Sequence, residues 1–203
     1  MPKIEFFFDC SSPWTYLGFS RMQELAQELN VTVDWRPFLV GGVFNTVNPS
    51  IYESRANPVP AKQRYLAKDL QDWARYCGLR IRWPPTVFPA NSVKAMRGCL
   101  AAAESDKLAP FALATFAAYW SDDRDISQDA VISDIAALAD LDANALLARI
   151  TEPTIKQALR SNTDELIARG GFGSPTIFVN GDNMYFGNDR MPLIRDVLER
   201  VRT

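Results

Sequence analysis

The chain contains no histidine among its 203 residues. Histidine is the commonest general base, the usual partner of a serine or cysteine nucleophile and the commonest metal ligand. Its absence excludes Ser-His-Asp and Cys-His catalysis and argues against a catalytic zinc or iron site. Cysteine is also scarce: Cys10, Cys77 and Cys99 are odd in number and widely spaced. They offer neither a disulfide framework nor a zinc site, so we expect small buried apolar residues in a protein of the reducing cytoplasm.

Long apolar runs and a strong charge of either sign are missing as well. The apolar start ends at Phe8, too early for the core of a signal peptide, and no later segment approaches a membrane span. The formal net charge of −2 gives no electrostatic reason to bind nucleic acid or an anionic membrane. The composition is typical of a soluble globular protein with one domain, or one domain that carries a large insertion.

The apolar pattern at both ends of the chain predicts an α/β fold of the thioredoxin type. Strands are expected at 4–8 and 31–38 around a helix at 14–29, a β-α-β unit with parallel strands and a right-handed crossover. Near the other end, a strand at 175–179 and a tight turn lead into a strand at 184–186. A last helix, opened by Asn188-Asp189, is expected through Val201.

Between these two ends the sequence predicts a helical segment. The glycines and the Asn/Pro-rich stretch within 41–60 predict an irregular loop. Helices are expected over 63–76, 92–105, 110–120, 129–140, 142–150 and 152–169. We therefore divide the chain into a thioredoxin-like domain, residues 1–40 and 152–203, and a helical insertion domain, residues 41–151.

The most informative motif is a strand that runs directly into a helix. Ser12 is suited to cap this helix and Pro13 to occupy its first position. Such a turn presents free backbone N–H groups and the positive end of the helix dipole. Thioredoxin-like oxidoreductases place a Cys-x-x-Cys pair there because the turn stabilises a thiolate, but this chain has Ser12 and Thr15. We predict a site that activates a thiol brought by a ligand.

Ser12 has three interpretations. It can be an N-cap without further function. As a hydrolase nucleophile it would lack both a histidine base and a Gly-x-Ser-x-Gly turn. As a thiolate partner, its hydroxyl can donate to a sulfur anion, and one charge-assisted hydrogen bond is worth roughly the 1.4 kcal/mol that lowers a thiol pKa by about one unit. We favour the third interpretation because of motifs elsewhere in the chain.

Three further features are candidates for binding. The Ser174–Pro175 bond is predicted to be cis and to turn the Ser174 backbone toward an extended peptide, the alternative being an ordinary trans proline. Asp189 either caps the last helix or pairs with the ammonium of an amino-acid head group whose carboxylate meets the amide of Asn188 and the helix amides. Lys62 follows a proline-rich loop and is either a solvated surface lysine or a cation at the mouth of the insertion.

Together these motifs resemble the glutathione-dependent 2-hydroxychromene-2-carboxylate isomerases and the kappa-class glutathione transferases, of the DsbA-like branch of the thioredoxin superfamily. The resemblance covers essentially the whole chain. It rests on Phe-x-Phe-Asp-x-x-Ser-Pro-x-x-Tyr-Leu at 6–17, Gly-x-Phe-Gly-x-Pro-Thr at 170–176 and Phe-Gly-Asn-Asp-Arg-Met at 186–191. It implies a cytoplasmic homodimer that takes glutathione and a small aromatic carboxylate, with a role in aromatic degradation such as naphthalene catabolism.

The resemblance also implies roles for particular residues. Ser12 would be catalytic and hydrogen-bond the glutathione sulfur, and Ser174, beside cis Pro175, would pair through its backbone with the cysteinyl residue. Asn188 and Asp189 would hold the γ-glutamyl end. The family usually has an apolar residue where this chain has Ser174. The full expected glutathione-binding set is Ser12, Asn57, Lys62, Ser174, Pro175, Asn188 and Asp189.

The implied reaction interconverts a cyclic hemiketal acid and its trans ring-opened benzylidenepyruvate by reversible thiolate addition. The pocket for the aromatic acid is expected to comprise Trp35, Phe38, Phe44, Arg82, Trp83 and Phe88. Two alternatives stay open: a kappa-like transferase or peroxidase for other electrophiles, and a non-catalytic thioredoxin-fold module that binds peptides. A disulfide oxidoreductase is disfavoured because neither Ser12 nor Thr15 can exchange disulfides.

Overall fold

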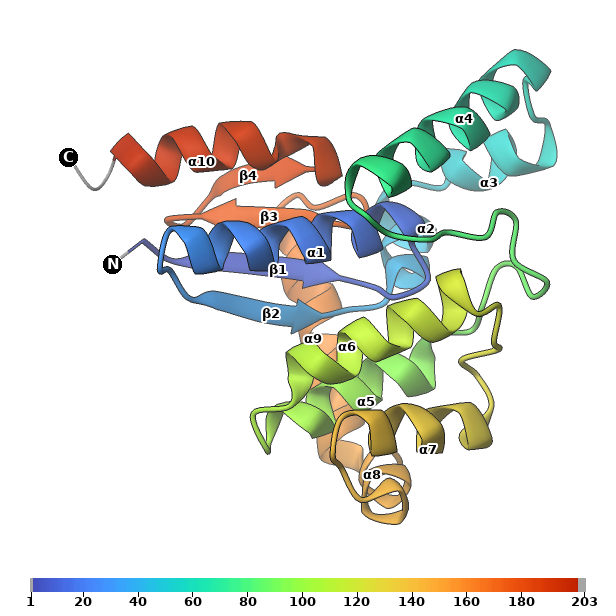
Figure 1. Ribbon diagram of the computed structural model, residues 1–203, viewed down its shortest axis with the longest axis vertical. Coiled ribbons are helices and arrows are strands. Elements are labelled where there is room, and N and C mark those ends of the chain that lie inside the picture. The colour runs from blue at the N-terminus through green and yellow to red at the C-terminus, as the bar shows by residue number, and fades with distance from the viewer. Residues whose placement is uncertain (1, 201–203) are drawn as a thin grey trace.

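The apolar runs from both ends of the chain meet in one mixed sheet. The computed structural model describes residues 2–200, and the strand order of its four-stranded sheet is β2-β1-β3-β4 (Figure 1). The strands are β1 (Ile4–Phe8), β2 (Val33–Pro37), β3 (Thr176–Val179) and β4 (Asn183–Phe186). β1 runs parallel to β2 and antiparallel to β3, which is antiparallel to β4. The crossover from β1 to β2 is α1 (Pro13–Glu28). This is the predicted thioredoxin-like arrangement.

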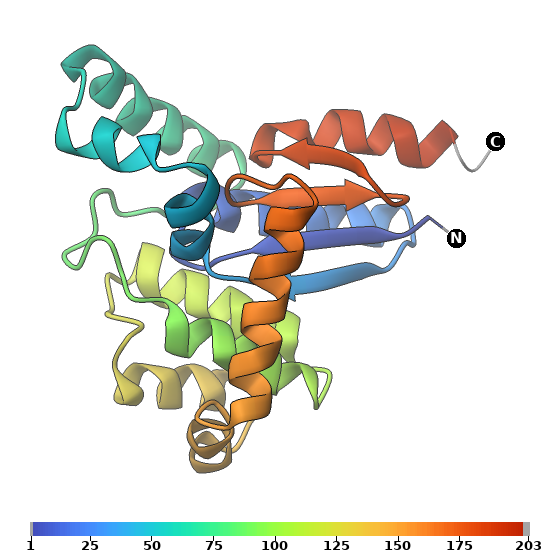
Figure 2. The same ribbon diagram turned by 180° about the vertical axis from the view of Figure 1, so that it is seen from behind.

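Each face of the sheet has its own core, because successive side chains of a strand point to opposite sides. Phe6 and Phe8 pack against Phe19 of α1 in the larger core. Phe7 points the other way and packs with Phe178 and with Leu166 of α9 (Pro153–Ala168). In Figures 1 and 2, α1 and α10 (Met191–Arg200) cover one face of the sheet and α9 covers the other.

The remaining helices lie beyond the β2 edge and beyond the carboxyl end of β1 (Figures 1 and 2). They are α2 (Val40–Val47), α3 (Ser50–Ala56), α4 (Pro60–Tyr76), α5 (Val93–Ala103), α6 (Leu108–Phe116), α7 (Asp129–Leu138) and α8 (Ala143–Arg149). Helix α6 continues into a π-helical turn at Ala117–Ser121, and a 3₁₀ turn, Asn188–Arg190, precedes α10. The division into two domains stays a prediction. No helix among residues 2–200 is both long enough and apolar enough to cross a bilayer.

The predicted irregular loop within 41–60 is wrong, since α2 and α3 occupy most of it. The glycines that suggested a loop lie within α2, where packing outweighs their low helix propensity. Val43 is fully buried in the smaller core and fixes α2 against the sheet. The other helices lie within a few residues of their predicted ranges. The predicted end of the last helix at Val201 lies outside the described residues.

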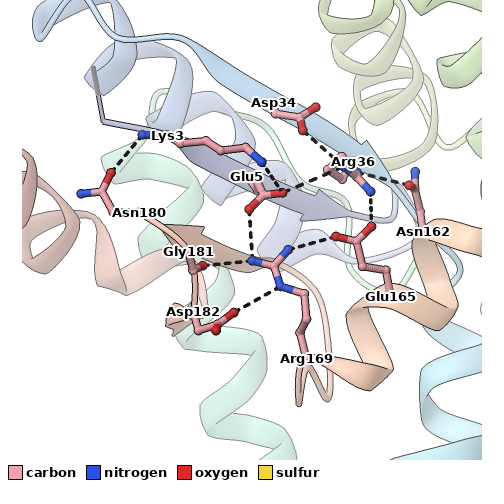
Figure 3. A network of polar contacts seen from close by, with 10 residues as sticks. All are labelled: Lys3, Glu5, Asp34, Arg36, Asn162, Glu165, Arg169, Asn180, Gly181 and Asp182. Carbon is pink, nitrogen blue, oxygen red and sulfur yellow. Dashed lines mark hydrogen bonds and ion pairs between the residues drawn. The ribbon is translucent and has the colours of Figure 1, made fainter.

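A network of charged side chains lies on the face of the sheet that α9 covers (Figure 3). Glu5, 5% exposed on the central strand, is 3.1 Å from Arg169 and 3.1 Å from Lys3. Arg36 joins the network through an ion pair with Glu165 of α9. Burial would raise the pKa of the Glu5 carboxyl, but Arg169 and Lys3 outweigh it and hold this pKa below its ordinary value of 4.5.

Candidate active site

Ser12 stands where β1 gives way to α1. Its backbone is extended, and its Oγ accepts a hydrogen bond from the Thr15 N–H at 3.3 Å, while Pro13 takes the first helical position. The N–H of Trp14 makes no hydrogen bond within the described residues. A thiolate placed at this turn would therefore meet a hydroxyl, a free amide and the positive end of a helix.

The predicted cis bond between Ser174 and Pro175 is confirmed. The Ser12 Oγ donates to the Ser174 carbonyl oxygen at 3.3 Å, which brings the predicted catalytic hydroxyl beside the proline. The backbone N–H of Ser174 has no hydrogen-bond partner among residues 2–200. The cis-proline turn thus offers a free amide to a ligand next to Ser12.

Ser174 uses its hydroxyl inside the protein. The Ser174 and Thr15 hydroxyl oxygens are 2.7 Å apart, and the Asp9 N–H donates to Ser174 Oγ at 3.0 Å. Thr15 is fully buried and Ser174 is 7% exposed. These bonds tie the cis-proline turn to the start of α1. They use the Ser174 hydroxyl and leave its backbone N–H without a partner among the described residues.

Asn188 is brought to the same place by a close approach of α1. A Cβ at Gly18 would lie 3.1 Å from Pro175 Cγ and 3.6 Å from Asn188 Cα, so a larger residue at Gly18 would force the two segments apart. The Gly187 N–H donates to the Pro175 carbonyl oxygen at 3.1 Å. Arg21 of α1 donates to the Asn188 carbonyl oxygen at 2.8 Å. Ser12, Pro175 and Asn188 therefore line one end of α1.

The Asn188 side chain carries a buried donor without an acceptor. The residue is 4% exposed, and its Nδ2 has no hydrogen-bond partner within the described part of the chain. Leaving a buried polar group unpaired costs about 1–3 kcal/mol. A ligand acceptor would remove that cost. Asp189 is 44% exposed at its side chain and lies 3.4 Å from Arg190, so its carboxylate is accessible.

Asp9 is a site residue that we did not single out from the sequence. Its carboxylate accepts from the N–H groups of Ser11 and Val40, each at 2.9 Å, and from the Ser92 hydroxyl at 3.1 Å. Burial raises the pKa of this carboxyl above its ordinary value of 3.8, although the three donors act to lower it. The signal available in the sequence was an aspartate directly after a buried strand and before the Ser-Pro turn.

The cysteines are not placed to act as nucleophiles. Cys10 is fully buried, and burial raises the pKa of its thiol well above the ordinary value of 9.0, with Cys99 and Asp9 adding to the effect. Cys99 is fully buried too, as predicted. Cys77 is only half-buried, so the prediction of a buried residue is wrong there. The turn at the start of α1 therefore offers the positive end of a helix dipole to a thiolate, but the protein places no thiol of its own there.

Asn57 and Lys62 are exposed and stand apart from this cluster. Asn57 ends α3, and Lys62 lies in the first turn of α4. Within residues 2–200 no hydrogen bond or ion pair links either side chain to Ser12 or Asn188. Their part in glutathione binding stays a prediction.

Two of the aromatic residues expected in the substrate pocket pack against the protein's own core. Trp35 packs against Phe19, with ring centroids 4.0 Å apart, and against Phe6 at 5.1 Å. Phe38 is fully buried in the smaller core. Trp35 is only partly buried, so its part in a substrate pocket stays a prediction, whereas Phe38 is enclosed on the opposite face of the sheet.

The other expected pocket residues lie outside the core. Trp83 and Phe88 are in edge-to-face contact at 5.1 Å, in the connection between α4 and α5. Phe44 contacts Tyr52 at 6.3 Å. Arg82 is ion-paired, its Nε 3.3 Å from Asp123 Oδ2. Their role in a substrate pocket stays a prediction.

A cavity of about 440 Å³ opens elsewhere, between α1, the end of α4 and α10. It is lined by Arg21, Glu24, Leu25, Glu28, Tyr76, Cys77, Met191, Pro192 and Arg195. None of the predicted site residues lines it. Its ionisable walls carry two arginines and two glutamates, so it has no clear preference for a charged ligand.

Comparisons with known proteins agree with this geometry. The family model described as the DSBA-like thioredoxin domain matches residues 3–199. The chain is 29% identical to glutathione S-transferase kappa 2 of Caenorhabditis elegans, covering 96% of this chain and 91% of that protein. It is 27% identical to 2-hydroxychromene-2-carboxylate isomerase of Pseudomonas putida, covering 98% and 95%.

A solved structure described as selenomethionine 2-hydroxychromene-2-carboxylate isomerase is similar in fold, with a TM-score of 0.82 and 24% identity over 98% of this chain and 95% of that chain. The matches confirm the resemblance stated from the motifs and the DsbA-like thioredoxin fold with inserted helices.

Proposed function

Because this chain belongs to the DSBA-like thioredoxin domain family, we propose that it uses glutathione to isomerise an electrophilic aromatic acid such as 2-hydroxychromene-2-carboxylate. One observation carries the proposal. The turn at the start of α1 presents the Ser12 hydroxyl beside the cis-proline turn, and no cysteine stands at position 12 or 15. A site of this kind stabilises a thiolate, and here the thiol must come from a ligand.

The residues present fit glutathione. Its peptide backbone needs partners of the kind that Ser174 offers, whose N–H is free within the described chain. Its γ-glutamyl carboxylate suits the buried Asn188 Nδ2, which has no partner in the described residues. Its ammonium suits the accessible carboxylate of Asp189. Asn57 and Lys62 are assigned to the remainder of the tripeptide on the resemblance alone.

When bound, glutathione supplies a thiolate that adds to a conjugated carbon and leaves again. While the sulfur is attached, the former double bond is a single bond and can rotate. The protein's part is to hold that thiolate. Ser12 would turn its hydroxyl from the Ser174 carbonyl to the sulfur, and the Trp14 N–H would face the same anion. Ser12 Oγ can keep accepting from the Thr15 N–H while its hydrogen turns to the sulfur, so α1 need not rearrange. The reaction needs no metal and no histidine, in keeping with the composition.

A kappa-like glutathione transferase is the second candidate, favoured by the relatives of that name at 27–29% identity. Both candidates require the same thiolate site and differ in the electrophile. A non-catalytic peptide-binding module would use the Ser174 backbone without needing Ser12. We also propose, from the resemblance alone, a cytoplasmic homodimer that acts in aromatic degradation.

Calorimetric titration with glutathione tests the proposal first. Saturable binding that raises the ultraviolet absorbance of the glutathione thiolate is expected for either enzyme. Assays with 2-hydroxychromene-2-carboxylate and with 1-chloro-2,4-dinitrobenzene then separate isomerase from transferase. Binding of unrelated peptides with no preference for glutathione would overturn both and favour the peptide-binding module.

A further inference from the structure

Arg55, in the last turn of α3, lies between two aromatic rings from separate segments. Its Cζ is 5.7 Å from the ring centroid of Phe44 in α2 and 5.7 Å from that of Phe88, in the connection between α4 and α5. In the part of the chain that the structure describes, its guanidinium makes no hydrogen bond and has no carboxylate within ion-pair distance. The rings contact the cation without using its N–H groups, so all five donors stay free.

Arg82, the cation expected from the sequence, is in a different position. Its Nε lies 3.3 Å from Asp123, and Asp123 also accepts from the N–H and hydroxyl of Thr86. A substrate carboxylate at Arg82 would lie beside the Asp123 carboxylate, and the like charges would repel each other. It would meet no such competitor at Arg55 among the described residues.

A run of aromatic rings connects Arg55 to the Ser12 turn. Trp120 donates from Nε1 to the Cys10 carbonyl oxygen at 2.9 Å, two residues before Ser12. Trp83 is stacked on Trp120 with centroids 6.1 Å apart, and Phe88 follows at 5.1 Å. Trp120 is fully buried, whereas Phe88 is 39% exposed. The run therefore leads outward from the turn, and its outer rings are open to a ligand.

We propose that Arg55 binds the carboxylate of the aromatic substrate, whose ring packs against Phe88, the exposed ring of the pair. The inference rests on the proposed function, since it supplies the binding site for the second substrate. A guanidinium recognises a carboxylate through two parallel N–H···O bonds in its own plane. The two rings flank the guanidinium, and none of its N–H donors has a partner among the described residues.

The test measures binding of trans-cinnamate, a conjugated aromatic acid, and of its uncharged amide, cinnamamide, by calorimetry. Arg55→Met keeps the length of the side chain and removes the charge, and Arg55→Lys keeps the charge and removes the planar fork. Arg80→Met is the matched control, because Arg80 lies in the same connection as Phe88 but is ion-paired with Asp122 at 2.7 Å. Arg82→Met tests the alternative cation.

Wild-type protein should bind cinnamate more tightly than cinnamamide. Arg55→Met should weaken cinnamate at least tenfold and change cinnamamide by less than twofold, and Arg55→Lys should lie between. Arg80→Met and Arg82→Met should change either affinity by less than twofold. The inference is overturned if the wild type shows no preference for the acid, if both Arg55 variants bind cinnamate like the wild type, or if Arg82→Met gives the larger loss.

Glutathione affinity, titrated separately, distinguishes the two proposals. A wild type that does not bind glutathione refutes the proposed function, whether or not it binds cinnamate. If glutathione binds tightly and the Arg55 variants bind cinnamate as the wild type does, only the role of Arg55 is refuted. Because Arg55 is exposed, we expect thermal unfolding of both Arg55 variants to match that of the wild type.

Discussion

Replacing Ser12 with alanine removes one hydroxyl that serves both the fold and the proposed chemistry. In the free protein this hydroxyl makes two bonds of 3.3 Å, from the Thr15 N–H and to the Ser174 carbonyl. Both are longer than the usual range for bonds of their type, so each is weak. The loss of an N-cap costs about 0.5–2 kcal/mol, and we expect Ser12→Ala to fall in the lower half of that interval.

The effect on bound glutathione should be larger. A hydrogen bond to a charged group is worth about 1.5–3 kcal/mol, and about 1.4 kcal/mol corresponds to one pKa unit. The α1 dipole and the Trp14 N–H survive the substitution. The pKa of the bound thiol should therefore rise by about one to two units in Ser12→Ala without returning to its value in free solution.

The assay follows the ultraviolet absorbance of the glutathione thiolate against pH at saturating protein. Ser12→Thr keeps a hydroxyl and should restore most of the lowered pKa. Asp142→Ala is the control for the loss of a cap, since Asp142 caps α8 by accepting from the Ala145 N–H at 2.8 Å. It should lose similar stability and leave the titration unchanged. An unchanged titration in Ser12→Ala, with glutathione still bound, would refute the role given to Ser12.

Three further outcomes are expected. Asp189→Asn should weaken glutathione binding by about 1–3 kcal/mol with little effect on unfolding, because asparagine also caps helices; equal affinity by calorimetry would make Asp189 a cap alone. Asn188→Ala should reduce the stabilisation of the protein by glutathione in thermal melts, yet leave the free protein about as stable, since its Nδ2 has no partner in the described chain. Marked destabilisation of the free protein would contradict this. The pKa of Glu5 lies below 4.5, so its ion pairs stabilise the fold above that pH and are lost as pH falls through the folded-state pKa. The free energy of unfolding of Glu5→Gln should be about 1–3 kcal/mol lower than that of the wild type at pH 7, and the two values should converge in acid. A difference in unfolding free energy that does not change with pH would contradict this reasoning.

The strands and the turn at Ser12 could be predicted because their signals are local. Ile4–Phe8 is apolar apart from Glu5, and Ser12-Pro13 marks a helix start. The helix over 40–47 could not be predicted in this way. It contains two glycines and has no side-chain cap, and it depends on the burial of Val43 in a core built from distant strands.

The residues of the candidate site likewise differ in whether a local sequence motif identifies them. Residues that act through the backbone or at a helix start, such as Ser12 and Pro175, carry a recognisable motif. The burial of Phe38, by contrast, depends on the smaller core, which segments distant in the sequence build. The orphan amide of Asn188 and the uncompensated charge of Arg55 depend on which groups lie nearby. Such contacts join segments far apart in the sequence and leave no local pattern.

The Asp9 carboxylate sets a limit on how this protein can be shortened. One of its donors is the first amide of α2, and another is the hydroxyl of Ser92, just before α5. A minimal version that joined β2 directly to α9 would delete both Val40 and Ser92. It would keep a buried acid with only the Ser11 N–H left of its three donors, at the base of the Ser12 turn. A version reduced to the sheet would therefore need a different residue at position 9, because hydrogen bonds to the Asp9 side chain connect α2 and the start of α5 to the Ser12 turn.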